Sequence, residues 1–173
     1  MKKYPLILSI IFSGLYISFT LFFYFTERYG AFNFIYLMAI GALIPLVVLT
    51  IKLQRDTVYG GIISGRNAAR EGMRFVVYSI FFLLLFQTVF YFNGWREFKS
   101  EALPQDIREQ AMRLDQMNKR KFNETELQKK IQEELKNITL FKELSFVFYR
   151  YIFVGIFASF ISATFMKTTK YVS

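Results

Sequence analysis

Long runs of apolar residues alternate with polar stretches along this chain. Four of the runs are predicted to be membrane-spanning helices, because a helix needs about 20 apolar residues to cross the hydrocarbon core of a bilayer. These runs cover residues 5–25, 32–51, 75–92 and 146–166, and none of them contains Asp, Glu or Lys. Helices are expected rather than strands, because an open strand in lipid would leave backbone polar groups without partners.

The polar stretch before the fourth run, residues 93–144, is long enough to have structure of its own. It has no glycine after Gly94 and one proline, Pro104. A structureless loop of this length is uncommon, and two amphipathic helices fit the pattern better. The first is expected to begin near Pro104, with one face formed by Ile107, Ala111, Leu114 and Met117. The second is expected to begin at Asn123-Glu-Thr-Glu126, with one face formed by Leu127, Ile131, Leu135 and Ile138.

These two helices predict a helical hairpin outside the bilayer. Either their apolar faces bury each other, or the hairpin offers a docking surface to a partner. The second helix either continues into the fourth run or breaks between Asn137 and Thr139. The expected fold is therefore a single all-α integral membrane domain with four transmembrane helices and a helical hairpin insert between the third and the fourth.

The composition supports a membrane location and narrows the chemistry. Hydrophobic residues make up 54% of the chain and aromatic residues 20%, which exceeds the apolar content of ordinary soluble domains. The sequence has no Cys and no His, which excludes disulfides, imidazole general bases and the usual zinc and haem ligand sets. An enzyme acting on lipids would need clustered acidic residues near one interface, and Asp56 and Glu71 are too few. We therefore expect no catalytic residue, no metal, no cofactor and no enzymatic activity.

The net charge of +9 is explained by topology rather than by nucleic acid, because basic residues gather on the cytoplasmic side of membrane helices. Lysines precede the first run and follow the fourth, and the stretch between the second and third runs is also basic. The residues concerned are Lys2, Lys3, Lys52, Arg55, Arg66, Arg70, Arg74, Lys167 and Lys170. Both termini and the 52–74 stretch are therefore predicted to be cytoplasmic, with 93–144 outside and the first run an uncleaved anchor.

A glycine-rich stretch before the third run resembles a phosphate-binding loop at first sight. Gly60 to Gly65 satisfies the spacing of two glycines, but Arg66-Asn67 stands where such a loop has Lys and Ser or Thr. Nucleotide binding is therefore rejected, and Gly60 and Gly61 are interpreted as a turn. Ser64 is expected to cap a helix that displays Arg66, Arg70 and Arg74 along one side. These arginines either hold the phosphate of an anionic lipid headgroup or another ligand, or serve only as topology determinants.

Two further features lie within the predicted spans. Gly155, Ser159 and Ala163 recur every four residues and predict close helix packing, either inside the bundle or with a second copy or a partner membrane protein. Arg150 lies near the outer edge of the fourth span, where it either extends to the interface or pairs with Glu27, Glu97 or Glu143. Asn33, Gln87 and Thr88 are among the few other polar groups, so an ion-coupled carrier is disfavoured.

Several short motifs resemble a bacterial membrane family known as domain of unknown function 4199. They are Tyr59-Gly-Gly-Ile-Ile-Ser64, Arg70-Glu-Gly-Met-Arg-Phe75 and Ser159-Phe-Ile-Ser-Ala163 followed by Lys167. The resemblance implies a four-helix protein of the bacterial inner membrane, of a type common in Bacteroidota, with residues 93–144 periplasmic. It supplies no catalytic or ligand residue. We expect an accessory or assembly subunit that acts through helix packing and hairpin docking in the lipid bilayer; a small transporter or channel subunit is the alternative.

Overall fold

The computed structural model describes residues 3–26, 32–96, 99–100, 103–104, 107–108, 111–112 and 123–167. These residues form helices and contain no strand. Four long helices make up a bundle: α1 (Tyr4–Phe25), α2 (Phe32–Thr57), α3 (Gly65–Phe90) and α6 (Leu140–Met166). A π-helical segment, η2 (Tyr91–Trp95), continues α3, and a shorter helix, α5 (Glu124–Lys136), precedes α6. The all-α fold predicted from the sequence is confirmed.

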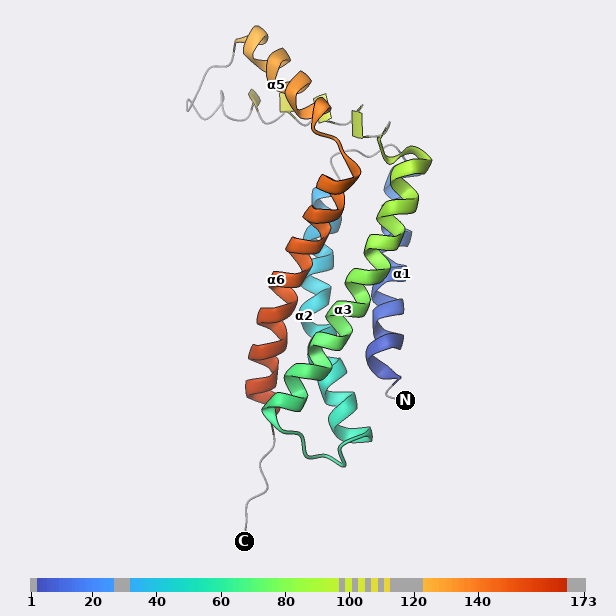
Figure 1. The fold of residues 1–173 in the computed structure, drawn as a ribbon, viewed down its shortest axis with the longest axis vertical. Helices are drawn as coiled ribbons and strands as arrows, with labels where there is room; N and C mark the ends of the chain where they lie inside the picture. Colours follow the sequence, from blue (N-terminus) through green and yellow to red (C-terminus); the bar gives the residue numbers. More distant parts are fainter. Residues whose placement is uncertain are drawn as a thin grey trace.

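Helix α3 is the centre of the bundle, because it packs against α1, α2 and α6, with its most extensive contact to α6. The turn between α2 and α3 lies at one end of the bundle, called the turn end here, where α1 begins and α6 finishes (Figure 1). Helix α5 lies at the opposite end, called the insert end (Figure 1). All four long helices are long and apolar enough to cross a membrane, as in a multi-pass membrane protein.

Three of the helices extend beyond the apolar runs. Helix α2 continues to Thr57 rather than ending near residue 51, α6 begins at Leu140 rather than near residue 146, and α3 begins at Gly65. The start of α3 confirms the helix predicted after Ser64, whose hydroxyl accepts a hydrogen bond from the Asn67 backbone N–H at 3.3 Å. Polar residues at the turn end are therefore carried on the same helices as the core.

The bundle core combines branched aliphatic residues with aromatic rings. Leu43, Val47 and Ile51 of α2 follow one another at helical spacing and are fully buried. The ring of Phe12 meets that of Phe75 edge-on, with centroids 6.0 Å apart. The outward faces carry many exposed Phe, Ile and Leu side chains, as expected for helices that are apolar all round and face lipid.

Glycines shape both ends of α3. Gly60 and Gly61 have φ values of 63° and 85°, in the left-handed region that favours glycine, and they form the predicted turn between α2 and α3. At the other end Gly94 has φ 128°, where η2 leaves helical geometry. A Cβ on Gly94 would also overlap the Tyr24 hydroxyl. Glycine is therefore favoured at position 94 both by its backbone conformation and by the close approach of Tyr24.

The described part of the insert has a small apolar cluster, the insert cluster, formed by Ile107, Ala111, Leu127 and Ile131. The two predicted faces therefore bury each other at these positions; Leu114, Met117 and the connection between the helices lie outside the described residues. Helix α5 starts where predicted, but its N-cap Asn123 makes no side-chain capping bond. The chain breaks at Asn137–Thr139, so α5 is not continuous with α6.

Candidate functional site

The turn end contains a buried carboxylate that the sequence analysis placed outside the spans. Glu71 of α3 has no exposed side-chain surface. Its Oε1 accepts a hydrogen bond from the Tyr59 hydroxyl at 2.9 Å and one from Arg74 Nη1 at 2.8 Å. A buried carboxylate is costly unless it is paired and hydrogen-bonded, and these contacts supply both. We call Tyr59, Arg70, Glu71 and Arg74 the Glu71 cluster.

The three arginines predicted to act together have three different environments. Arg74 is the ion-pair partner of Glu71. Arg70 Nη2 donates to the Tyr59 hydroxyl at 3.2 Å and to Asn67 Oδ1 at 2.8 Å, while its Nε lies 3.9 Å from Glu71. Arg66 is exposed and forms no ion pair within the described part of the chain. The helical spacing therefore placed the three arginines on one helix correctly, and the i, i+3 spacing of Glu71 and Arg74 is the sequence signal for the ion pair that distinguishes Arg74 from Arg66.

A groove between α3 and α6 lies beside this cluster. Its volume is about 530 Å³, and the residues that line it come from the first turns of α3 and the last turns of α6. They are Gly65, Arg66, Ala69, Arg70, Met73, Phe160, Ala163, Thr164 and Lys167. We call it the basic groove, because its polar wall carries Arg66, Arg70 and Lys167.

The small-residue stripe of α6 faces α3 of the same chain. Gly155, Ser159 and Ala163 are all buried. A Cβ on Gly155 would overlap the methyl groups of Val76, and one on Gly72 would lie 2.8 Å from Ser159 Oγ. Close packing inside the bundle is therefore the role that the structure gives to these residues.

The interior of the bundle also contains buried polar side chains that the pattern of apolar runs did not indicate. Gln54 of α2 is fully buried, and neither atom of its amide has a hydrogen-bond partner among the described residues. The same holds for the Ser79, Tyr151 and Ser159 hydroxyls. Gln54 lies seven residues after Val47 and three after Ile51, on the same helical face, so extending the helical period past the apolar run would have found it.

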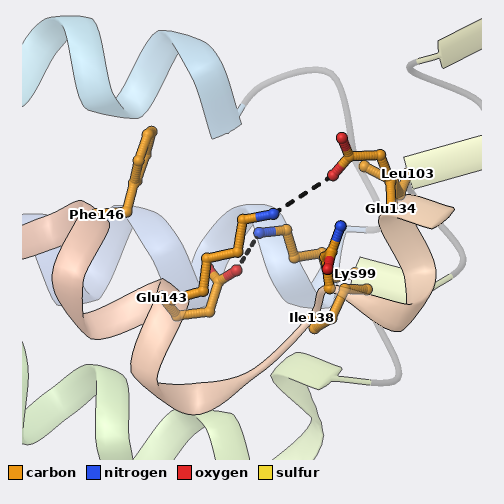
Figure 2. A pocket seen from close by; sticks show the side chains of 8 residues that line it. Lys99, Leu103, Glu134, Ile138, Glu143 and Phe146 are labelled. Atoms are coloured by element: carbon orange, nitrogen blue, oxygen red, sulfur yellow. Dashed lines mark hydrogen bonds and ion pairs between the residues drawn. The ribbon is translucent and has the colours of Figure 1, made fainter. Parts of the chain in front are cut away.

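At the insert end Glu143 of α6 joins three elements. Its Oε2 accepts a hydrogen bond from the Trp95 indole N–H at 3.2 Å, and its Oε1 is ion-paired with Lys99. Figure 2 shows Lys99 and Glu143 beside a cavity of about 160 Å³, together with Glu134, whose Oε2 lies 3.6 Å from the Lys142 ammonium. The Trp95, Lys99 and Glu143 contacts, called the Glu143 anchor here, attach the start of the insert to α6.

Arg150 does not pair with Glu143, which was one of its three predicted acidic partners. Its guanidinium group lies 4.0 Å from the Phe146 ring centroid and 4.7 Å from that of Tyr36. Stacking on ring faces provides a favourable environment for a half-buried cation. Glu27 and Glu97, the other two predicted partners, lie outside the described residues, as does the side chain of Asn33. Thr88 donates to the carbonyl of Leu84 in its own helix at 2.8 Å.

Comparison with protein families matches residues 6–168 to the family described as "Protein of unknown function (DUF4199)". The chain belongs to this family. No curated protein and no solved structure matched it.

The motifs that suggested the DUF4199 family come together at the turn end. Tyr59 of the first motif donates its hydroxyl hydrogen to Glu71 of the second. Gly72 of the second motif lies against Ser159 of the third, and Lys167 lines the basic groove. Segments far apart in the sequence therefore form one region in this member of the family.

Proposed function

We propose that this protein is a non-enzymatic accessory or assembly component of the bacterial inner membrane. In the proposed orientation the turn end is cytoplasmic and the insert is periplasmic. The observation that carries the proposal is the Glu143 anchor, which attaches the start of the insert to α6. An insert attached to the bundle by buried contacts loses less conformational entropy on binding a partner than a free segment would.

The exposed surface of α5 is polar and carries both positive and negative side chains. Its apolar face is covered by the insert cluster, so docking would use the exposed surface of α5. The exposed charged residues of α5 are Glu124, Glu126, Lys129, Lys130, Glu133 and Lys136. Charges of both signs at fixed positions favour one register and orientation of a partner with complementary charges. A periplasmic protein or the periplasmic part of another membrane protein would have that chemistry.

The proposal is tested by placing a photo-crosslinking amino acid at Lys129 or Glu133 of the full chain in native membranes. We expect one defined adduct, identified by mass spectrometry and recovered again when the partner itself is purified. The matched control is the same amino acid at Lys52, which is exposed at the turn end and should give no such adduct. Glu143→Gln should reduce the yield at Lys129, because it weakens the anchor of the insert.

Two other outcomes of this experiment would change the proposed role. If Lys129, Glu133 and Lys52 gave the same background, and if mild detergent recovered the chain only as a monomer, the accessory role would be wrong. Recovery of two crosslinked copies of this chain would instead identify a homo-oligomer as the assembly.

One observation favours the alternative role of a small transporter or channel subunit. Buried polar atoms without partners are rare in proteins and costly in a membrane interior, and Gln54, Ser79 and Tyr151 supply such atoms on three different helices. A polar path could use them as binding positions.

The test is ion flux into vesicles that contain the purified chain. Gln54→Leu should reduce a specific flux while Gln132→Leu, on the exposed face of α5, leaves it unchanged; flux equal to that of empty vesicles would exclude this role.

A further inference from the structure

We infer that the basic groove binds one anionic phospholipid, with the lipid phosphate on Arg66 and Lys167 and an acyl chain along Met73 and Phe160. This inference goes beyond the proposed assembly role and does not depend on it. It rests on the charge of the groove, on its position at the level of the lipid headgroups and on its apolar wall.

The charge of the groove is only partly compensated: Arg70 Nε lies 3.9 Å from Glu71, whereas Arg66 and Lys167 form no ion pair among the described residues. Its described lining residues include Arg66, Arg70 and Lys167 but no Asp or Glu. Arg74, one turn further along α3, is instead neutralised by Glu71 at 2.8 Å and does not line the groove. Three cations beside one another repel each other, and a phosphate between them would relieve that repulsion with charge-assisted hydrogen bonds.

The cations belong to two helices that meet at this point. An ideal Cβ built on Gly65 would lie 4.0 Å from Cδ of Lys167, which places the Lys167 side chain beside the first residue of α3. Arg70 is held in place by hydrogen bonds that it donates to Tyr59 and Asn67 and by its ion pair with Glu71. A planar guanidinium group oriented in this way keeps other N–H groups available to a phosphate oxygen.

The groove lies at the depth of lipid headgroups. Arg66 is in the first turn of α3, and Lys167 directly follows the last residue of α6, so both mark the ends of helices long enough to cross a bilayer. Basic residues at that level attract anionic lipids. Below them Met73 and Phe160 form an apolar wall, and Phe160 is 59% exposed on the lipid-facing side. A ligand with both a phosphate and an acyl chain matches this arrangement better than a soluble phosphate.

The test uses the full chain purified in a mild detergent and native mass spectrometry with two probes, dioleoyl phosphatidylglycerol and dioleoyl phosphatidylcholine. We expect the wild-type chain to retain phosphatidylglycerol preferentially. Arg66→Gln with Lys167→Gln should lower its apparent affinity for phosphatidylglycerol by roughly tenfold or more, because the charge-assisted hydrogen bonds from both residues to the lipid phosphate would be lost. Lys3→Gln with Lys52→Gln removes the same charge at the same end, outside the groove, and should change affinity by less than about twofold.

Two further arms separate the possible ligands. Phe160→Ala should weaken retention, whereas Phe157→Ala, on the lipid-facing side of α6 but outside the groove, should not. Inorganic phosphate and glycerol 3-phosphate should fail to displace the lipid when compared with sodium chloride of equal ionic strength. Displacement by inorganic phosphate alone would overturn the lipid in favour of a soluble phosphate ligand.

Equal retention of the two lipids by the wild-type chain would also overturn the inference, and this comparison requires no variant to fold. Equal losses in the two double variants would show a diffuse effect of surface charge instead of a site. Arg66→Lys, which keeps the charge, should retain most of the preference for phosphatidylglycerol.

Discussion

Gly155 of α6 lies against Val76 of α3, and Gly72 of α3 lies against Ser159 of α6. These pairs let the two helix backbones approach closely, in the way that small residues do in membrane proteins. The contact between α3 and α6 is also the most extensive in the bundle. The absence of a Cβ atom at Gly155 and Gly72 therefore permits the close contact between α3 and α6.

Gly155→Ala should lower the free energy of unfolding by about 1–3 kcal/mol, because the added methyl group overpacks the core against Val76. Thermal unfolding in detergent, followed by the helical circular dichroism signal, measures the change. Gly14→Ala is the control, since a Cβ on Gly14 would meet nothing within 4 Å. Combining Gly155→Ala with Val76→Ala should recover part of the loss; no recovery would show that the methyl clash is not the cause.

The Glu71 cluster gives a second prediction for single residues. Glu71→Ala should lower the free energy of unfolding by about 2–3 kcal/mol, less than for a fully buried ion pair because water can still reach Arg74. Arg74 is 40% exposed. The control is Asp56→Ala, which removes the exposed ion pair with Arg55 at 2.8 Å and should cost at most about 1 kcal/mol. Similar losses in the two variants would contradict the structural role of Glu71.

At the scale of elements, helix caps explain where the chain breaks between α5 and α6. The Thr139 hydroxyl accepts a hydrogen bond from the Lys142 backbone N–H at 3.3 Å, which is how an N-cap side chain satisfies a free N–H group in a first helical turn. Asn123 occupies the same position before α5 but makes no such bond. The break at Asn137–Thr139 is therefore stabilised locally by α6 itself.

Thr139→Ala should destabilise the first turn of α6 by about 1 kcal/mol. Hydrogen–deuterium exchange of the Lys142 amide should then become faster. Asn123→Ala is the matched comparison and should leave exchange at the start of α5 nearly unchanged. Faster exchange in both variants, or in neither, would mean that the capping bond does not stabilise α6.

For the whole molecule, the Glu143 anchor connects the insert to the bundle. Trp95 is the single tryptophan of the chain, so its fluorescence reports on the environment of this one side chain, which also packs against the Phe90 ring. Glu143→Gln should shift the Trp95 emission to longer wavelength and make it easier to quench with acrylamide, because the loss of charge weakens the contacts with Trp95 and Lys99. Glu134→Gln, which alters the exposed pair with Lys142 at 3.6 Å, should leave the emission unchanged. A buried emission spectrum in Glu143→Gln would show that the anchor does not depend on the carboxylate charge.

The proposed orientation gives a second prediction for the whole molecule. The chain has no Cys, so a single introduced thiol can be labelled without background. Lys129→Cys on α5 should react with a membrane-impermeant maleimide in cells whose outer membrane has been opened. Val58→Cys in the exposed turn between α2 and α3 should react only after the inner membrane is permeabilised. The reverse pattern would place the insert in the cytoplasm.

The sequence by itself determined the features that depend on neighbours along the chain. Long apolar runs specify helices because lipid leaves no other way to satisfy the backbone, and the fold class follows from them. Gly60 and Gly61 specify a turn because they adopt positive φ without strain. Ser64 specifies a helix start because its hydroxyl binds an N–H three residues away.

Only the tertiary structure decided which side chains from different helices meet. Trp95 and Glu143 are 48 positions apart, and helical periodicity places each on a face of its own helix without showing which faces are opposite. For the same reason the sequence could not show that the Tyr59 hydroxyl meets Glu71 or that Arg150 lies on the Tyr36 ring. By contrast, Glu71 with Arg74 and Phe146 with Arg150 are i, i+3 and i, i+4 pairs that the helical spacing itself brings together. Local patterns thus specify the helices and their own side-chain pairs, whereas the mutual rotation and approach of the helices decide the Glu143 anchor and the groove.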